Sequence, residues 1–195
     1  HSGVHFDAAH PSDLETLLAT HPLDDPSLLS RARDGIAFLR RENLSKYSAF
    51  DEGLPGPAPG YVLVVDQTAG DASVRASGAD GETFRTMLAA ARADHPGARI
   101  VVRTHPETAL GLPPGHFTEA DLAETEPCDT AVSPWRLLDG ASAVYAVSSQ
   151  LGFEAILAGH RPVLYGQPFY AGWGASEDRA GAPSRRGRPL TPDQL

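Results

Sequence analysis

Four short polar segments carry side chains that could bind or transform a ligand. The first covers residues 66–73 and reads DQTAGDAS. Asp71 could act there as a nucleophile, a base or a hydrogen-bond acceptor. Asp71 or Ser73 could instead only cap a turn or a helix, because short polar side chains favour such positions. The residues alone leave both interpretations open.

The second segment contains His105 followed by Pro106. An imidazole can donate a hydrogen bond to a phosphate or exchange a proton near neutral pH. The same dipeptide begins at His10, His21 and His95, and a structural role is common for a single histidine. Those three pairs do not follow a predicted strand. Position therefore favours His105 as the functional histidine.

The third segment places Ser148 and Ser149 just before a predicted helix. Two hydroxyl groups beside the unpaired N–H groups and positive dipole of a helix N-terminus form an anion site. Glu154 lies one turn further along, where it could reach ribose hydroxyls. The alternative is that Ser149 is a helix cap and that Glu154 only favours the helix dipole.

The fourth segment, residues 165–174, reads YGQPFYAGWG. Aromatic side chains among glycines and a proline could form a rigid loop that stacks on a base or a sugar, with glycine allowing close approach. The candidate contacts are Tyr165, Gly166, Tyr170 and Trp173. The alternative is a loop whose aromatic rings fold over the core.

Each polar segment follows a short apolar run that is typical of a strand. These runs cover residues 61–66, 99–103, 144–147 and 162–165. Helical patterns separate them, as at Phe84, Met87, Leu88 and Ala91, at 133–138 and at 150–158. Alternating strands and helices predict an α/β fold with a Rossmann-like parallel sheet and helices on both faces. Such sheets bind ligands at the carboxyl ends of their strands.

The chain divides into three parts by composition. Residues 1–53 form a helical connecting segment in which Ser12 and Glu15 make a capping box. Residues 54–60 are a Pro/Gly linker, and residues 61–195 form the Rossmann-like domain, which the resemblance described below implies to be nucleotide-sugar-binding. We expect both ends of the chain to be cuts through a larger protein. A second expectation is that the late stretch with Arg185, Arg186 and Arg188 is an exposed loop.

Composition excludes several classes of protein. The net charge of −9 argues against a general nucleic-acid binder, which needs a basic face. No apolar run approaches the ~20 residues of a membrane span, and no signal peptide is present. The single Cys128 allows no internal disulfide and favours a cytoplasmic location. Motifs for zinc, P-loop, dinucleotide and α/β-hydrolase sites are also absent from the sequence.

Five strings together resemble one family. They are GVHFDAAHPSDLE, VVDQTAGDASVR, RTHPET, VSPWRLLDGASAVYAVSSQLGFEA and YGQPFYAGWG. In this order they are similar to the capsule polysaccharide biosynthesis family, the KpsC/KpsS-like retaining β-Kdo transferases. The resemblance implies a GT-B fold of which this chain is the C-terminal half. It also implies transfer of Kdo from CMP-Kdo to a lipid-linked glycan acceptor, without a metal or other cofactor.

The resemblance also implies roles for individual residues. His105 with Pro106 and Ser148 with Ser149 would hold the cytidylate phosphate, and Glu154 would hold the ribose. Asp71 would be the nucleophile, because a covalent glycosyl-enzyme intermediate explains retention as two inversions. Gln67 would orient Asp71 or the Kdo carboxylate. Contacts to the sugar or from the loops would come from Ser73, Arg103, Tyr165, Gly166, Tyr170 and Trp173.

Two other functions stay open. A nucleotide-sugar 2-epimerase shares the GT-B fold and also uses histidines and carboxylates around its nucleotide. The second is a nucleotide- or glycan-binding module without catalytic activity. This piece would lack the facing N-terminal Rossmann-like half, so it could bind a ligand without catalysing a reaction. The resemblance further implies a location at the inner face of the membrane, where a lipid-linked acceptor would lie.

Overall fold

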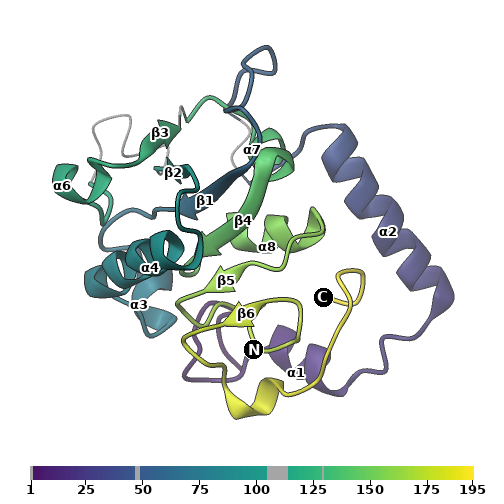
Figure 1. The fold of residues 1–195 in the computed structure, drawn as a ribbon. Coiled ribbons are helices and arrows are strands. Elements are labelled where there is room, and N and C mark those ends of the chain that lie inside the picture. Colours follow the sequence, from purple (N-terminus) through teal and green to yellow (C-terminus); the bar gives the residue numbers. More distant parts are fainter. Residues whose placement is uncertain (1, 47–48, 105–113, 129) are drawn as a thin grey trace.

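The computed structural model describes residues 2–46, 49–104, 114–128 and 130–195. In this part of the chain, six strands form one parallel sheet with the order β3-β2-β1-β4-β5-β6 (Figure 1). The strands are β1 Tyr61–Val65, β2 Ile100–Arg103, β3 Glu126–Cys128, β4 Ala141–Ala146, β5 Val163–Leu164 and β6 Glu177–Asp178. This order is that of the Rossmann fold, which confirms the predicted α/β class.

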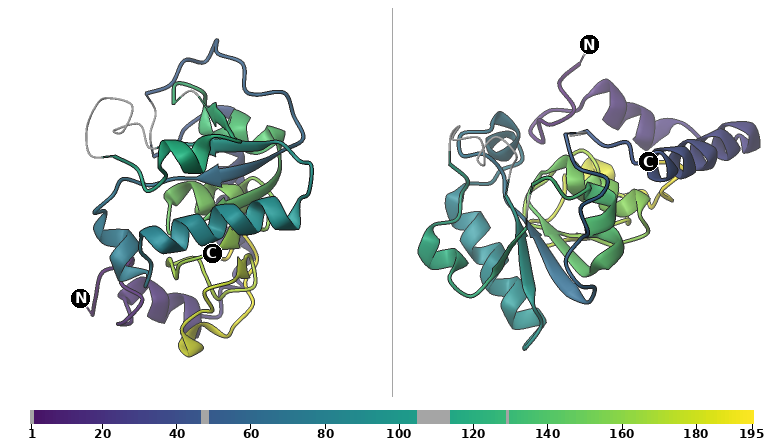
Figure 2. Two further views of the ribbon diagram at one scale, coloured as in Figure 1. Left: turned by 60° about the vertical axis from the view of Figure 1, so that its left-hand side comes forward. Right: turned by 90° about the horizontal axis from the view of Figure 1, so that it is seen from above.

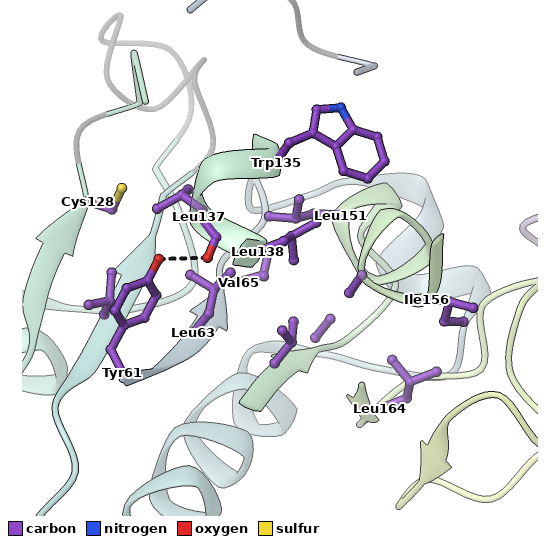
Figure 3. Close-up of a cluster of buried hydrophobic side chains, with 14 of the residues drawn as sticks. Tyr61, Leu63, Val65, Cys128, Trp135, Leu137, Leu138, Leu151, Ile156 and Leu164 are labelled. Carbon is purple, nitrogen blue, oxygen red and sulfur yellow. Dashed lines mark hydrogen bonds between the residues drawn. The ribbon is translucent and has the colours of Figure 1, made fainter. Parts of the chain in front are cut away.

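Strand β1 lies at the centre of the sheet and is buried on both faces, which explains its unbroken apolar sequence. Tyr61, Leu63 and Val65 point to one face, where they pack against α7 (Pro134–Gly140) and α8 (Gln150–Leu157). The Tyr61 hydroxyl donates a 2.6 Å hydrogen bond to the Leu137 carbonyl oxygen within this cluster (Figure 3). The strand and α7 are thereby tied together at their buried surface.

The opposite face of the sheet is covered by α4 (Gly81–Asp94) and the short α3 (Ala72–Ala76) (Figure 2). A capping box of Asp80 and Thr83 starts α4. Its buried residues are those of the predicted amphipathic pattern: Phe84, Met87, Leu88 and Ala91. The prediction of helices on both faces is therefore confirmed.

The four strands expected from apolar runs are present, and two further strands are not apparent in the sequence. β3 contains Glu126 and Pro127, and β6 consists of Glu177 and Asp178 alone. Neither has an apolar pattern, because each adds to an edge of a sheet that already exists. Pairing with β2 and β5 makes these residues strands.

Two helices precede the sheet domain, as the sequence predicts. α1 (Asp13–Thr20) begins at the cap Ser12, and α2 (Pro26–Arg41) begins at the cap Asp25. In Figure 1, α1 lies beside the C-terminal part of the chain, and α2 runs along the side of the molecule. Short α6 (Glu119–Leu122) completes the helices described in this chain outside the 3₁₀ turn below. Of the helices that the structure describes, none is long and apolar enough to cross a membrane.

The late arginine-rich stretch is only in part the exposed loop that was expected, because Arg185 is exposed whereas Arg186 is buried. A 3₁₀ turn, η1 (Ser184–Arg186), packs on α1. The Arg186 side chain is only 1% exposed and its Nε donates to Glu15 Oε2 at 2.6 Å. Arg185 pairs with the same carboxylate. The buried negative charge of Glu15, 171 residues away, holds Arg186 in the interior, which local composition cannot reveal.

Candidate functional site

The site lies where the strand order reverses, between β1 and β4. In sheets of this topology the loops after these two strands part, and ligands bind in the crevice at their carboxyl ends. A cavity of about 460 Å³ lies there, within the usual range for small-molecule sites. Its walls are His5, Phe6, Lys46, Gln67, Asp71, Ala72, Ser73, Ser148, Ser149, Gln150, Pro168 and Phe169.

Gln67 links the two loops. Its side-chain Nε2 donates to Ser148 Oγ at 3.1 Å and lies 3.4 Å from Ser73 Oγ. Its Oε1 accepts from the backbone N–H of Ser148 at 3.0 Å. Gln67 is only 3% exposed, so these bonds satisfy an amide that would be costly to bury unpaired. The structure thus brings Gln67 and Ser73 of the first polar segment together with Ser148 of the third.

Asp71 lines the same cavity and is partly exposed. It also caps α3, because its Oδ1 accepts from the Ser73 backbone N–H at 2.8 Å. The capping role and the ligand-facing role, which looked like alternatives in the sequence, are therefore compatible. The cap fixes the position of the carboxylate at the wall of the cavity.

The N-terminus of α8 forms the far side of the cavity. Ser149 caps this helix, and its Oγ accepts from the Leu151 N–H at 3.3 Å. The Tyr170 hydroxyl donates to the Ser149 carbonyl oxygen at 2.5 Å and so holds the cap from behind. The positive end of the helix and the Ser148 and Ser149 hydroxyl groups make this wall suitable for an anion.

Glu154 lies behind this wall, in a recess of about 30 Å³ that adjoins the cavity through Lys46, Ser149 and Gln150. Its Oε1 accepts from Ser45 Oγ at 2.8 Å and from the Lys46 backbone N–H at 3.2 Å. Burial raises the pKa of the Glu154 carboxyl above its ordinary value, against the lowering effect of these two bonds. A ligand hydroxyl that bound Glu154 would share or replace these partners.

Arg103 lines the recess and is 6% exposed. Its guanidinium donates to the carbonyl oxygens of Val132 at 2.9 Å and Thr130 at 2.8 Å. These bonds place the cation at the end of β2 and use it to hold the segment before α7. The structure gives Arg103 this supporting position beside the recess, not a wall of the larger cavity.

The aromatic loop contributes a different residue from those expected. Tyr170 and Trp173 are both 0% exposed and pack into hydrophobic clusters, so these two rings form the core plug that was the alternative interpretation. Phe169 lies in the cavity wall instead. The alternation of buried and cavity-facing rings is set by the turn, which the sequence does not specify.

Tyr165 and Gly166 also lie outside the cavity wall. The Tyr165 hydroxyl accepts from Arg179 at 3.4 Å. Gly166 is buried, and a Cβ at this position would approach Ser77 Oγ within 2.7 Å and the Val147 carbonyl oxygen within 2.9 Å. Glycine is needed there for close packing of the chain against α3 and β4, not for approach to a ligand.

The predicted pair His105 and Pro106 lies outside the described residues. The chain that returns after them is held by Asp66 at the end of β1. Asp66 Oδ1 accepts from the backbone N–H groups of His116 at 3.0 Å and Gln67 at 2.8 Å. Burial raises the pKa of Asp66, against the lowering effect of these bonds. Asp66 therefore joins the β1 loop to the segment that follows residue 113.

Sequence analysis missed His5, Phe6, Lys46, Gln150 and Phe169 in the cavity wall. The first two lie in the string GVHFDAAHPSDLE, which was noted for its resemblance, but more than fifty residues before the sheet domain, and no role was assigned to them. Phe169 lies in the fourth polar segment, YGQPFYAGWG, but was not among the predicted ligand contacts. In the part of the chain that the structure describes, no group of three or more His, Cys, Asp or Glu side chains forms a metal site.

This chain is similar to known proteins over most of its length. The sequence model described as "Capsule polysaccharide biosynthesis protein" matches residues 45–194. The capsule polysaccharide modification protein LipA of Neisseria meningitidis serogroup B is 36% identical over 184 residues, covering 91% of this chain and 26% of LipA. The lipopolysaccharide-processing protein LpsZ of Rhizobium meliloti is 31% identical, covering 96% of this chain and 44% of LpsZ. The chain thus spans less than half the length of these relatives.

Two solved structures from Thermosulfurimonas dismutans are also similar. KpsC described as a β-Kdo 2,4 transferase has a TM-score of 0.87 and 36% identity, and covers 99% of this chain and 61% of its own. KpsC described as a β-Kdo 2,7 transferase has a TM-score of 0.76 and 29% identity, with 99% and 58% covered. Because the family model matches residues 45–194, well over half of the chain, the chain belongs to the capsule polysaccharide biosynthesis family.

Proposed function

We propose that this chain is the nucleotide-sugar-binding half of a retaining glycosyltransferase that uses CMP-Kdo. Its partner would be a facing N-terminal Rossmann-like half, giving a GT-B enzyme with the acceptor bound between the halves. The acceptor would be a lipid-linked glycan of capsular polysaccharide synthesis, reached from the cytoplasmic face of the membrane. Similarity to the two KpsC transferases supports this assignment.

The observation that carries the proposal is the grouping of Asp71, Ser148 and Ser149 around one cavity at the switch point. A carboxylate and an anion-binding helix terminus that line one cavity fit a sugar joined to a phosphate. Ser148 and Ser149 would bind the cytidylate phosphate, with His105 and Pro106 contributing from the second loop. Glu154, in the adjoining recess, would accept from ribose hydroxyls.

In the first step, an Asp71 oxygen would attack the anomeric carbon of Kdo as the bond from that carbon to the phosphate oxygen breaks. CMP leaves with the bonding electron pair, and the Ser148–Ser149 wall stabilises its charge. In the second step, an acceptor hydroxyl attacks the same carbon, Asp71 leaves as a carboxylate, and the hydroxyl proton passes to a base or to water. Two inversions give retention.

Gln67 would keep the phosphate-binding serines and Asp71 in fixed positions relative to one another. It is bonded to both Ser148 and Ser73, and Ser73 donates its N–H to Asp71. A shift of the phosphate wall would therefore be transmitted to the nucleophile. Because the phosphate charge is met by helix and hydroxyl donors, the proposed reaction needs no metal ion.

Ligand-induced thermal stabilisation tests the proposal. CMP and CMP-Kdo should raise the melting temperature, because a ligand at a hundredfold excess over its Kd adds about 2.7 kcal/mol to the stability. UDP-GlcNAc should not. Stabilisation by UDP-GlcNAc without CMP would instead support the 2-epimerase alternative and overturn the transferase assignment.

A further inference from the structure

We propose that the N-terminal residues His5 and Phe6 form the sugar-binding wall of the site and select an acidic sugar on the donor. This inference rests on the proposed function, because it assumes that the phosphate lies against Ser148 and Ser149. It concerns a segment that precedes residues 45–194, the part matched by the family model.

The segment that carries His5 and Phe6 is anchored on both sides. The Ala8 N–H donates to the Ala76 carbonyl oxygen at the end of α3 at 3.0 Å. The Ala8 carbonyl oxygen accepts from Arg185 at 2.6 Å. A buried backbone group bonded in both directions leaves the residues just before it with little freedom. The wall is therefore built into the fold and is not a free chain end.

Three rings line this side of the cavity. His5 makes edge-to-face contacts with Phe6, at 5.5 Å between ring centroids, and with Phe169, at 5.6 Å. Phe169 in turn packs on Phe153 of α8 at 5.1 Å. Phe6 remains 37% exposed, a large apolar side chain with no full covering. The rings thus form a surface that is supported from behind and open toward the cavity.

This aromatic wall and the polar residues of the β1 and β4 loops line the same cavity. A sugar has polar edges and apolar C–H faces, so such a pairing fits a sugar ring. With the phosphate at Ser148 and the anomeric carbon near Asp71, the ring would extend toward His5 and Phe6. The imidazole N–H can donate to a carboxylate, a bond stronger than one to a neutral hydroxyl. This chemistry favours a sugar acid.

The test compares CMP with CMP-Kdo on the intact chain by titration calorimetry. We expect His5→Ala and Phe6→Ala each to weaken CMP-Kdo binding about tenfold, the loss of one hydrogen bond to a charged group or of one stacked ring. CMP binding should stay within about twofold of wild type. His5→Gln should recover part of the loss, because its amide can still donate.

Phe38→Ala is the matched control. Phe38 is a similarly exposed aromatic residue, 47% exposed, but lies on α2 away from the cavity wall. It should leave both affinities unchanged. Equal affinity of the wild type and both wall variants for CMP-Kdo would overturn the inference, as would an equal loss for CMP. If wild type bound no CMP at all, the proposed function itself would fail, which separates the two outcomes.

Discussion

Asp71 has two tasks at the residue scale, since it caps α3 and lines the cavity. Asparagine is the right substitution to separate them, because it caps helices as well as aspartate but is a far poorer nucleophile. In a protein that joins this chain to its facing half, Asp71→Asn should lower kcat for Kdo transfer at least about a thousandfold. The Kd for CMP, measured by calorimetry, should stay within about threefold. Full transfer by the variant would remove Asp71 from the nucleophile role.

Glu154 should reveal a conflict between stability and ligand binding. Its folded pKa lies above the ordinary 4.5, so it binds its proton more tightly when folded. It therefore favours folding most below pH 4.5, and this contribution is lost as the pH rises through the folded pKa. Glu154→Gln keeps an acceptor for Ser45 but carries no charge. We expect it to raise the melting temperature at pH 7 and to weaken CMP binding.

The pH dependence of the melting temperature provides the control for Glu154→Gln. Below pH 4.5 the wild-type carboxyl is protonated in both states, so the difference in melting temperature between Glu154→Gln and wild type should shrink there. A constant difference from pH 4 to pH 8 would show that the effect is not that of a buried charge.

At the scale of elements, the aromatic loop fixes the position of α8. A methyl group on Gly152 of α8 would overlap the Tyr170 hydroxyl and approach its Cζ within 3.0 Å. That hydroxyl already donates to Ser149. We therefore expect Gly152→Ala to destabilise the fold by about 1–3 kcal/mol through overpacking, as measured by urea unfolding.

Gly35→Ala is the matched substitution in another helix. No atom lies within 4 Å of a Cβ built at Gly35 of α2. Without a clash, alanine should stabilise the protein by about 0.5–1 kcal/mol, because it loses less backbone freedom on folding. If Gly152→Ala stabilised the protein as much as Gly35→Ala does, the packing of the aromatic loop on α8 would be disproved.

Strands could be predicted from sequence where both faces of the sheet are covered. β1 and β2 are entirely buried and contain mostly β-branched residues, so their apolar runs are visible. In the site, position after a strand identified Gln67, Asp71 and Ser148. Phe169, Tyr170 and Trp173 share one loop, and which ring faces the ligand depends on the turn geometry. Residue types alone do not contain that information.

At the scale of the molecule, the first and last parts of the chain are joined by charge. Glu15 is 5% exposed and faces both Arg185 and Arg186. Removing one partner of a buried pair leaves an uncompensated charge. Glu15→Ala should therefore lower the free energy of unfolding by about 3–5 kcal/mol, measured by urea denaturation.

The exposed pair of Arg33 and Asp193 provides the comparison. Arg33 of α2 lies 2.7 Å from Asp193, measured from Nη1 to Oδ2, and so also joins two distant parts of the chain. The Arg33 side chain, however, is 59% exposed. Arg33→Ala should cost no more than about 1 kcal/mol. A similar cost for both variants would show that the Glu15 cluster is solvated and does not hold the molecule together.

The Glu15–Arg186 pair also sets an order of events during protein synthesis. Glu15 leaves the ribosome before Arg186, which follows it 171 residues later. A nascent chain can pair β1, β2 and β4 before that arginine has been translated. His5 and Phe6 can settle against Phe169 only after residue 169 has left the ribosome. The loops after β1 and β4 would therefore form on the ribosome before His5 and Phe6 complete the cavity wall.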